Sequence, residues 1–220
     1  MTNPRLQVAL DVTDLDRALY VASQVIDIAD RIEVGTPLLR KHGVFAIQAI
    51  RAKFHEAILV ADCKIMDFGE SETKLAIDAG ADGVIVQAVA PTETIEAVCR
   101  TAQRLGAFAM VDCIGITNMT SLARKLNGLP LSHLIIHKSK DEQTSMGPIR
   151  ARETLDLAVG NYLAPLAIAG GITAANVSEL VALPQIDTLI VGEAIVSSAT
   201  PQDVARSLIG AWTKELHWTT

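Results

Sequence analysis

Short apolar segments recur along the whole chain, separated by stretches whose apolar residues follow a helical period. Eight such segments lie at residues 6–10, 31–34, 58–61, 83–89, 107–111, 133–136, 163–169 and 188–191. Their starts are roughly 25 residues apart, so each interval holds one strand, one helix and two short loops. Strands that alternate with helices pair in parallel through right-handed crossovers. Eight such units predict an α/β fold, with one compact (β/α)8 TIM barrel spanning residues 1–220.

Residues that favour helix ends lie at the expected ends of the helical stretches. They include Asp14 before the first helical stretch, Gly106 after the stretch that Thr92 opens, and Pro184 after the stretch over 174–182. A doubly wound open sheet is the alternative. That fold usually has fewer strands, and no GxGxxG sequence follows the first apolar segment, so the barrel is favoured.

Composition and charge exclude several classes of function. The net charge is −6 and there is no basic run, so we expect no nucleic-acid partner and no anionic membrane surface. No apolar stretch reaches the roughly 18 residues of a membrane span. The three cysteines form no CxxC pair, which argues against a disulfide framework. Together these features predict a cytoplasmic protein that binds a small molecule.

Polar and ionisable residues gather where the apolar segments end. In a (β/α)8 barrel, functional groups lie at the carboxyl ends of the strands. Polar ends of this kind occur by chance in some strands, but here they follow most of them. The candidates in this position are Asp11, Glu33, Asp62, Lys64, Asp67, Asp112, His137, Gly170, Gly171 and Gly192.

Lys64 is the first candidate catalytic residue. Residues 62 and 64 share one face of an extended segment, so we expect the Lys64 ammonium to stand beside Asp62 and Asp67. Asp11 and Glu33 are expected to approach it from neighbouring strands. Flanking carboxylates keep a buried lysine charged, and a fixed ammonium can stabilise an enolate or deliver a proton. The alternatives are a structural ion-pair network for Lys64 and a helix cap for Asp11.

Two carboxylates suggest a metal site. Glu33 and Asp62 end adjacent strands, and carboxylate oxygens suit a hard cation such as Mg2+ whose remaining positions are filled by water or substrate. The alternative is that both carboxylates only neutralise Lys64.

A glycine pair predicts a phosphate site. Gly170, Gly171 and Gly192 follow the last two apolar segments, where TIM barrels often bind phosphate through backbone N–H groups. Glu193 argues against this site, because its carboxylate would repel a phosphate unless the side chain points away.

His137 ends the sixth segment and suits proton transfer near neutral pH. Lys138 and Lys140 follow it; we expect one of them to meet an anionic substrate and the other to be solvated. The alternative is a surface turn with solvated charges.

These residues lie in motifs that resemble a known family. The motifs are LQVALD (6–11), IEVGTP (32–37), ADCKIMDFGE (61–70), DAGAD (78–82), VDCIGI (111–116), HKSKDEQ (137–143), AIAGGIT (167–173) and IVGEAI (190–195). The chain resembles the orotidine-monophosphate-decarboxylase suprafamily of small (β/α)8 barrels. Within it, the chain looks most like the 3-hexulose-6-phosphate synthases and the 3-keto-L-gulonate-6-phosphate decarboxylases. The DxKxxD element at residues 62–67 is specific to the suprafamily.

The resemblance implies a sugar-phosphate substrate and a Mg2+ ion held by Glu33 and Asp62. The reaction then passes through a cis-enediolate that Lys64 stabilises, and His137 transfers protons. The synthase branch adds formaldehyde to ribulose 5-phosphate, whereas the decarboxylase branch loses carbon dioxide. The resemblance also implies a homodimer in which Asp67 reaches into the partner's site.

Three positions bear on the branch. Asp112 and Ala169 resemble the synthases, and Lys140 resembles the arginine of the decarboxylases. Phe68 and Glu193 depart from both branches. We therefore expect a hexulose-phosphate synthase; the alternatives are a keto-gulonate-phosphate decarboxylase and a diverged barrel that binds a sugar phosphate without catalysis.

Overall fold

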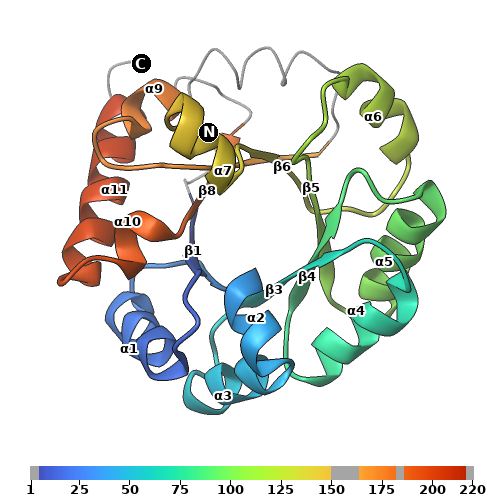
Figure 1. The fold of residues 1–220 in the computed structure, drawn as a ribbon, viewed down its shortest axis with the longest axis horizontal. Helices are drawn as coiled ribbons and strands as arrows, with labels where there is room; N and C mark the ends of the chain where they lie inside the picture. Colours follow the sequence, from blue (N-terminus) through green and yellow to red (C-terminus); the bar gives the residue numbers. More distant parts are fainter. Residues whose placement is uncertain (1–4, 150–163, 182–185, 217–220) are drawn as a thin grey trace.

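The eight strands of the computed structural model pair in parallel and close into a barrel (Figure 1). The structure describes residues 5–149, 164–181 and 186–216. The strands are β1 (Arg5–Leu10), β2 (Arg31–Val34), β3 (Leu59–Ile65), β4 (Gly83–Gln87), β5 (Phe108–Asp112), β6 (His133–His137), β7 (Leu166–Ala169) and β8 (Ile186–Val191). Because β1 pairs with both β2 and β8, the sheet has no edge. The predicted TIM barrel is confirmed and the open sheet is excluded.

Helices surround the barrel as an outer ring (Figure 1). They are α1 (Leu15–Val25), α2 (Thr36–His42), α3 (Phe45–Lys53), α4 (Gly69–Asp78), α5 (Thr92–Arg104), α6 (Met119–Leu126), α7 (Lys140–Met146), α9 (Val177–Val181), α10 (Glu193–Val196) and α11 (Pro201–Leu216). The side chain of Asp14 accepts a hydrogen bond from the Arg17 N–H and caps α1. Asp11 is therefore not the cap of this helix.

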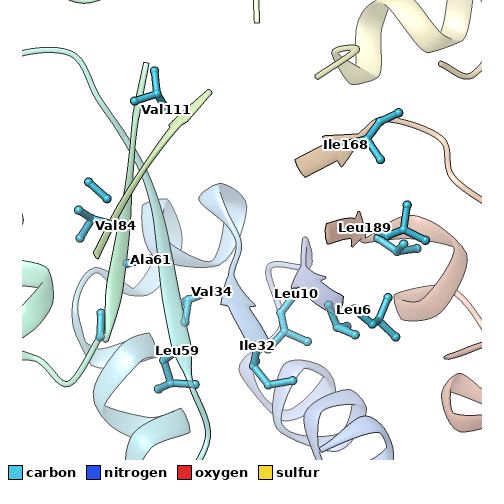
Figure 2. Close-up of a cluster of buried hydrophobic side chains, with 14 of the residues drawn as sticks. Leu6, Leu10, Ile32, Val34, Leu59, Ala61, Val84, Val111, Ile168 and Leu189 are labelled. Carbon is cyan, nitrogen blue, oxygen red and sulfur yellow. The ribbon is translucent and has the colours of Figure 1, made fainter. Parts of the chain in front are cut away.

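Alternation along the strands divides the core into two parts. Even-numbered residues of β1 and β2, together with Leu189 and Val191 of β8, pack between the strands and the helices; Figure 2 shows Leu6, Leu10, Ile32 and Leu189 among them. The other set fills the inside of the barrel and is Ala9, Val60, Ile85, Met110, Ile135, Ala167, Ala169 and Ile190. Side chains two residues further along a strand point the same way. The polar residues that follow this inner set are thereby brought to one end of the barrel.

The strand bounds differ from the prediction mainly in β3. This strand continues to Ile65 instead of ending at residue 61, and its register with β4 shifts between Ala61 and Ile65. Lys64 lies in the shifted part with φ 48°. Irregularities of this kind re-aim side chains and are common beside active sites.

The segment after β7 also differs from the prediction. The expected helix over 174–182 begins only at Val177, because the Asn176 side chain closes a turn with the Thr173 N–H and the Gly171 carbonyl. Pro184 and the expected start of the seventh strand at residue 163 lie outside the described residues.

The cysteines and the helices agree with two further expectations. Cys63, Cys99 and Cys113 are all free thiols, so no disulfide joins them. Within the described ranges, every helix is too short or too polar to cross a lipid bilayer.

Candidate active site

A cavity of about 730 Å3 opens at the carboxyl ends of the strands. All but two of the predicted site residues line it. They are Asp11, Glu33, Asp62, Lys64, His137, Lys140, Gly170, Gly171 and Gly192. The two exceptions are Asp67 and Asp112.

Lys64 lies between two carboxylates. Its Nζ is 3.1 Å from Asp62 Oδ2 and 3.2 Å from Asp112 Oδ2. Burial alone would lower the pKa of Lys64, but these two carboxylates outweigh burial and raise it above its ordinary value. The ammonium is therefore charged at neutral pH. Its second partner is Asp112, where the sequence suggested Asp67.

Asp112 contacts both Lys64 and His137. Its Oδ2 accepts hydrogen bonds from His137 Nδ1 at 3.0 Å, Gln87 Nε2 at 3.2 Å and Lys64, and its Oδ1 accepts from the Ile114 N–H. Burial would raise the pKa of Asp112, but the bond and charge of His137, together with Lys64, lower it to about 2. These contacts orient Lys64 and His137, and direct binding of substrate by Asp112 stays a prediction.

The hydrogen bond from His137 also selects its tautomer. The carboxylate of Asp112 accepts the hydrogen bond from Nδ1, so in the neutral form of the ring the lone pair is on Nε2. His137 lines the cavity, so it can act there as a base.

Glu33 and Asp62 offer oxygen atoms to a cation. Gln7 Nε2 donates to Glu33 Oε2 at 2.5 Å, and Thr36 Oγ1 donates to Asp62 Oδ2 at 2.7 Å. Asp62 Oδ1 is buried and has no hydrogen-bond partner in the described part of the chain. The pKa of Glu33 is raised well above its ordinary value by burial, and then by Asp62 and Asp11. A cation would relieve this concentration of negative charge.

The protein would supply only a few of the ligands of such a metal ion. Among the described residues, no group of three or more His, Cys, Asp or Glu side chains is placed to hold a metal. The pair Glu33 and Asp62 suits Mg2+, which commonly binds one or two carboxylates and keeps several waters.

The Asp11 carboxylate has room only because residues 35 and 192 are glycines. A Cβ atom at Gly35 would overlap Asp11 Oδ1, and one at Gly192 would lie 2.7 Å from Asp11 Oδ2. Burial, and then Asp62, raise the pKa of Asp11. Gly35 and Thr36 were not recognised as site residues, although both lie in the IEVGTP motif. They shape the site without taking part in acid–base chemistry.

Gly170 and Gly171 form part of the cavity wall. Both have positive φ, 120° and 71°. A Cβ at Gly170 would lie 2.6 Å from the Lys138 carbonyl oxygen, and one at Gly171 would lie 2.8 Å from Pro148 Cβ. Only glycine fits these positions without displacing the backbone.

The two lysines after β6 have different surroundings. Lys138 is buried, and its Nζ lies 3.4 Å from the Pro148 carbonyl oxygen. Lys140, at the start of α7, lines the cavity and pairs with Glu193, at the start of α10. Lys140 is therefore the lysine that faces the site, and its ammonium compensates the carboxylate that argued against a phosphate.

Asp67 lies apart from the other candidates within one chain. It is exposed, and its Oδ1 accepts a hydrogen bond from the Phe68 N–H at 2.8 Å. Phe68 has φ 51° and is 71% exposed. A contact between Asp67 and Lys64 is therefore not formed within one chain.

Comparison with known families shows to which protein family the chain belongs. A family model described as orotidine 5'-phosphate decarboxylase / HUMPS family matches residues 4–208. The chain belongs to this family. The match covers every strand of the barrel and each of the candidate site residues.

Relatives from both branches of the family resemble the chain. The 3-hexulose-6-phosphate synthase of Mycobacterium gastri is 33% identical over 94% of this chain and 99% of its own length. A solved 3-hexulose-6-phosphate synthase from Salmonella typhimurium is 35% identical with a TM-score of 0.90, covering 96% of this chain and 99% of that one. A solved 3-keto-L-gulonate-6-phosphate decarboxylase from Vibrio cholerae is 30% identical with a TM-score of 0.84, covering 97% and 99%.

Some relatives are longer. The chain spans about half the length of curated relatives described as bifunctional enzyme Fae/Hps.

Proposed function

We propose that this chain is a Mg2+-dependent aldehyde-lyase of the 3-hexulose-6-phosphate synthase type, acting as one barrel domain over residues 1–220. The reaction joins formaldehyde to ribulose 5-phosphate through a cis-enediolate. The observation that carries this proposal is the bridge from Asp112 to both Lys64 and His137 at the cavity. It places the Lys64 ammonium beside an imidazole that can transfer protons, which is what enolate chemistry requires.

The substrate phosphate would bind at the glycines. Gly170, Gly171 and Gly192 line one wall of the cavity, where backbone N–H groups can approach an anion closely. At the same wall, the Lys140 ammonium compensates the Glu193 carboxylate, which would otherwise repel the phosphate. A sugar phosphate held there would extend toward Lys64 and His137.

Glu33 and Asp62 would hold the Mg2+ ion. When bound, the ion would supply a Lewis acid that polarises the substrate oxygens. Thr36 and Gln7 each donate a hydrogen bond to one of the two carboxylates, so both side chains are held before the ion arrives.

The proton steps follow from the His137 tautomer. His137 Nε2 takes a proton from C1 of ribulose 5-phosphate, and the C–H electron pair forms the C1–C2 double bond of the enediolate. The Lys64 ammonium stabilises the negative charge on the oxygens. C1 then attacks the formaldehyde carbon, the carbonyl electron pair moves to oxygen, and that oxygen takes the proton back from His137.

Comparison of two reactions tests the proposal. The purified chain with Mg2+ should show a larger kcat/KM for ribulose 5-phosphate with formaldehyde than for 3-keto-L-gulonate 6-phosphate. A larger kcat/KM for the keto-gulonate would identify the decarboxylase instead. A chain that binds a sugar phosphate but turns over neither substrate would be the diverged, non-catalytic barrel.

The decarboxylase remains the second candidate because of Lys140. A cation at the cavity wall can hold a carboxylate or orient a water that protonates the enediolate. Formaldehyde is neutral and has no carboxylate to hold, so the synthase reaction does not need this charge.

We also propose that the chain forms a homodimer in which Asp67 completes the partner's site. Asp67 is exposed and lies outside its own chain's cavity lining. Two apolar side chains beside it, Met66 and Phe68, are 46% and 71% exposed. A second copy that covered them would bury apolar surface at the same place.

A further inference from the structure

Gln7 is a polar residue inside the barrel, below the cavity. It is fully buried on β1, two residues before Ala9, which belongs to the inner apolar set. In the pairing of β1 with β2, Gln7 lies opposite Arg31 and Ala9 lies opposite Glu33. The Gln7 side chain therefore lies one step along the barrel from the Glu33 carboxylate. TIM-barrel interiors are usually filled by branched apolar residues, so a buried amide at this position is unusual.

The hydrogen bond from Gln7 to Glu33 accounts for the amide in the barrel interior. Gln7 Nε2 donates to Glu33 Oε2 at 2.5 Å, and both side chains are buried. A carboxylate only accepts hydrogen bonds, so the NH2 end of the amide must face it. The other end, Gln7 Oε1, is left buried without a partner in the described part of the chain. Burying the Gln7 carbonyl without a partner costs free energy, and the hydrogen bond to Glu33 is what the amide provides at this position.

The second carboxylate of the proposed metal site is held in the same way. Thr36 Oγ1 donates to Asp62 Oδ2 at 2.7 Å, and Asp62 Oδ1 is left without a partner in the described ranges. Each carboxylate thus has one oxygen that accepts a hydrogen bond from a neutral donor, and Asp62 Oδ2 also pairs with the Lys64 ammonium. Neither Glu33 Oε1 nor Asp62 Oδ1 has a hydrogen bond from the residues that the structure describes, and both residues line the cavity.

We propose that Gln7 is a positioning residue for the metal site: it fixes one oxygen of Glu33 so that the carboxylate is preorganised to bind a divalent cation. This inference rests on the proposed function, which assigns Mg2+ to Glu33 and Asp62. Gln7 itself lies below the cavity and touches neither substrate nor ion. Outer-shell partners of this kind typically change metal affinity by about 10–100-fold when removed.

Binding of Mn2+, measured by electron paramagnetic resonance on the full chain without substrate, tests the inference. Gln7→Met keeps the length of the side chain but cannot donate to Glu33, and Gln7→Asn keeps an amide that is one methylene too short. Both variants should bind Mn2+ about tenfold more weakly than the wild type, or worse. The matched control is Thr188→Val, a buried change in the same barrel that breaks the bond to Asp187 and leaves Glu33 untouched. It should lower Tm without changing the Mn2+ Kd.

The outcomes separate the inference from the function on which it rests. If the wild type and both Gln7 variants bind Mn2+ with the same Kd, the positioning role is wrong and the metal site stands. If the wild type binds no Mn2+, the metal assignment fails and the inference fails with it. If Gln7→Met does not fold, the Mn2+ Kd of Gln7→Asn tests the inference, because that variant keeps a buried amide.

Discussion

Asp112 connects the two residues on which the proposed chemistry depends. Its buried carboxylate contacts both Lys64 and His137, and all three come from different strands, β5, β3 and β6. The sequence located these three residues because each is an ionisable group at the end of an apolar segment. It could not show which carboxylate Lys64 contacts, since that depends on the irregular backbone of β3. Gln7 and Thr36 were missed because they are neutral and because Gln7 lies within a strand, two residues before Ala9.

Removing the Lys64 charge should cost most of the activity. Lys64→Ala should lower kcat/KM by about 10²–10³, or roughly 3–4 kcal/mol, since the ammonium acts where negative charge develops. Steady-state kinetics on the folded variant measure this. Lys74→Ala, an exposed lysine on α4, is the control and should keep wild-type activity. A Lys64→Ala variant within tenfold of wild type would reduce Lys64 to a structural ion pair.

Acid should weaken the fold through Asp112. Hydrogen bonding and charge hold its pKa at about 2 in the folded chain, below the ordinary value of 3.8. A lowered pKa stabilises the fold above the unfolded-state value, and this contribution is lost as pH falls from about 4 to 2. Asp112→Asn should remove about 2 kcal/mol from the free energy of unfolding at pH 7. Urea unfolding measured from pH 7 to pH 2 should also show a shallower acid slope. An unchanged slope would contradict the assigned pKa.

At the scale of elements, strand and helix ends decide what faces the cavity. The repeat of apolar segments predicted every strand, because buried parallel strands need continuous apolar residues. It did not predict that β3 runs on to Ile65, since Asp62 and Lys64 interrupt the apolar pattern there. It also gave no sign that α7 and α10 would bring Lys140 and Glu193 together.

The Lys140 and Glu193 pair gives a prediction about the branch. Lys140→Leu should leave synthase activity unchanged or improved, and should lower any decarboxylation of 3-keto-L-gulonate 6-phosphate tenfold or more, about 1.4 kcal/mol. Lys140→Arg should shift the balance toward decarboxylation, because a guanidinium organises a carboxylate better than an ammonium does. Parallel kcat/KM measurements of both reactions check this. Glu193→Gln, which breaks the pair and keeps the lysine, is the control. Loss of synthase activity in Lys140→Leu would mean that this lysine serves ribulose 5-phosphate itself.

At the scale of the molecule, closure of the barrel assembles the site from both ends of the chain. Asp11, just after β1, lies against Gly192, just after β8, because these strands are neighbours. The number and spacing of the apolar segments were enough to predict this closure. The position of Asp67 was not predictable in the same way, since the resemblance places its contact in a second chain.

The dimer can be tested by complementation. Asp67→Ala and Lys64→Ala chains should each have no more than a small residual activity alone. After reversible dissociation and mixing, half of the dimers pair one of each, and each mixed dimer has one intact site of two. Recovered activity should approach about a quarter of wild type. Subunit exchange proved by mass spectrometry without any recovery, or a monomer in analytical ultracentrifugation, would contradict the shared site.

The proposed site joins formaldehyde to the enediolate of ribulose 5-phosphate. The most direct measurement is 13C NMR of the chain with Mg2+, ribulose 5-phosphate and 13C-formaldehyde. The label is expected at C1 of a 3-hexulose 6-phosphate, EDTA should abolish its transfer, and Lys64→Ala should slow it by about 10²–10³. Label that stays in formaldehyde with the folded, Mg2+-loaded chain would rule out the synthase reaction, and product that forms equally well in EDTA would rule out its dependence on Mg2+.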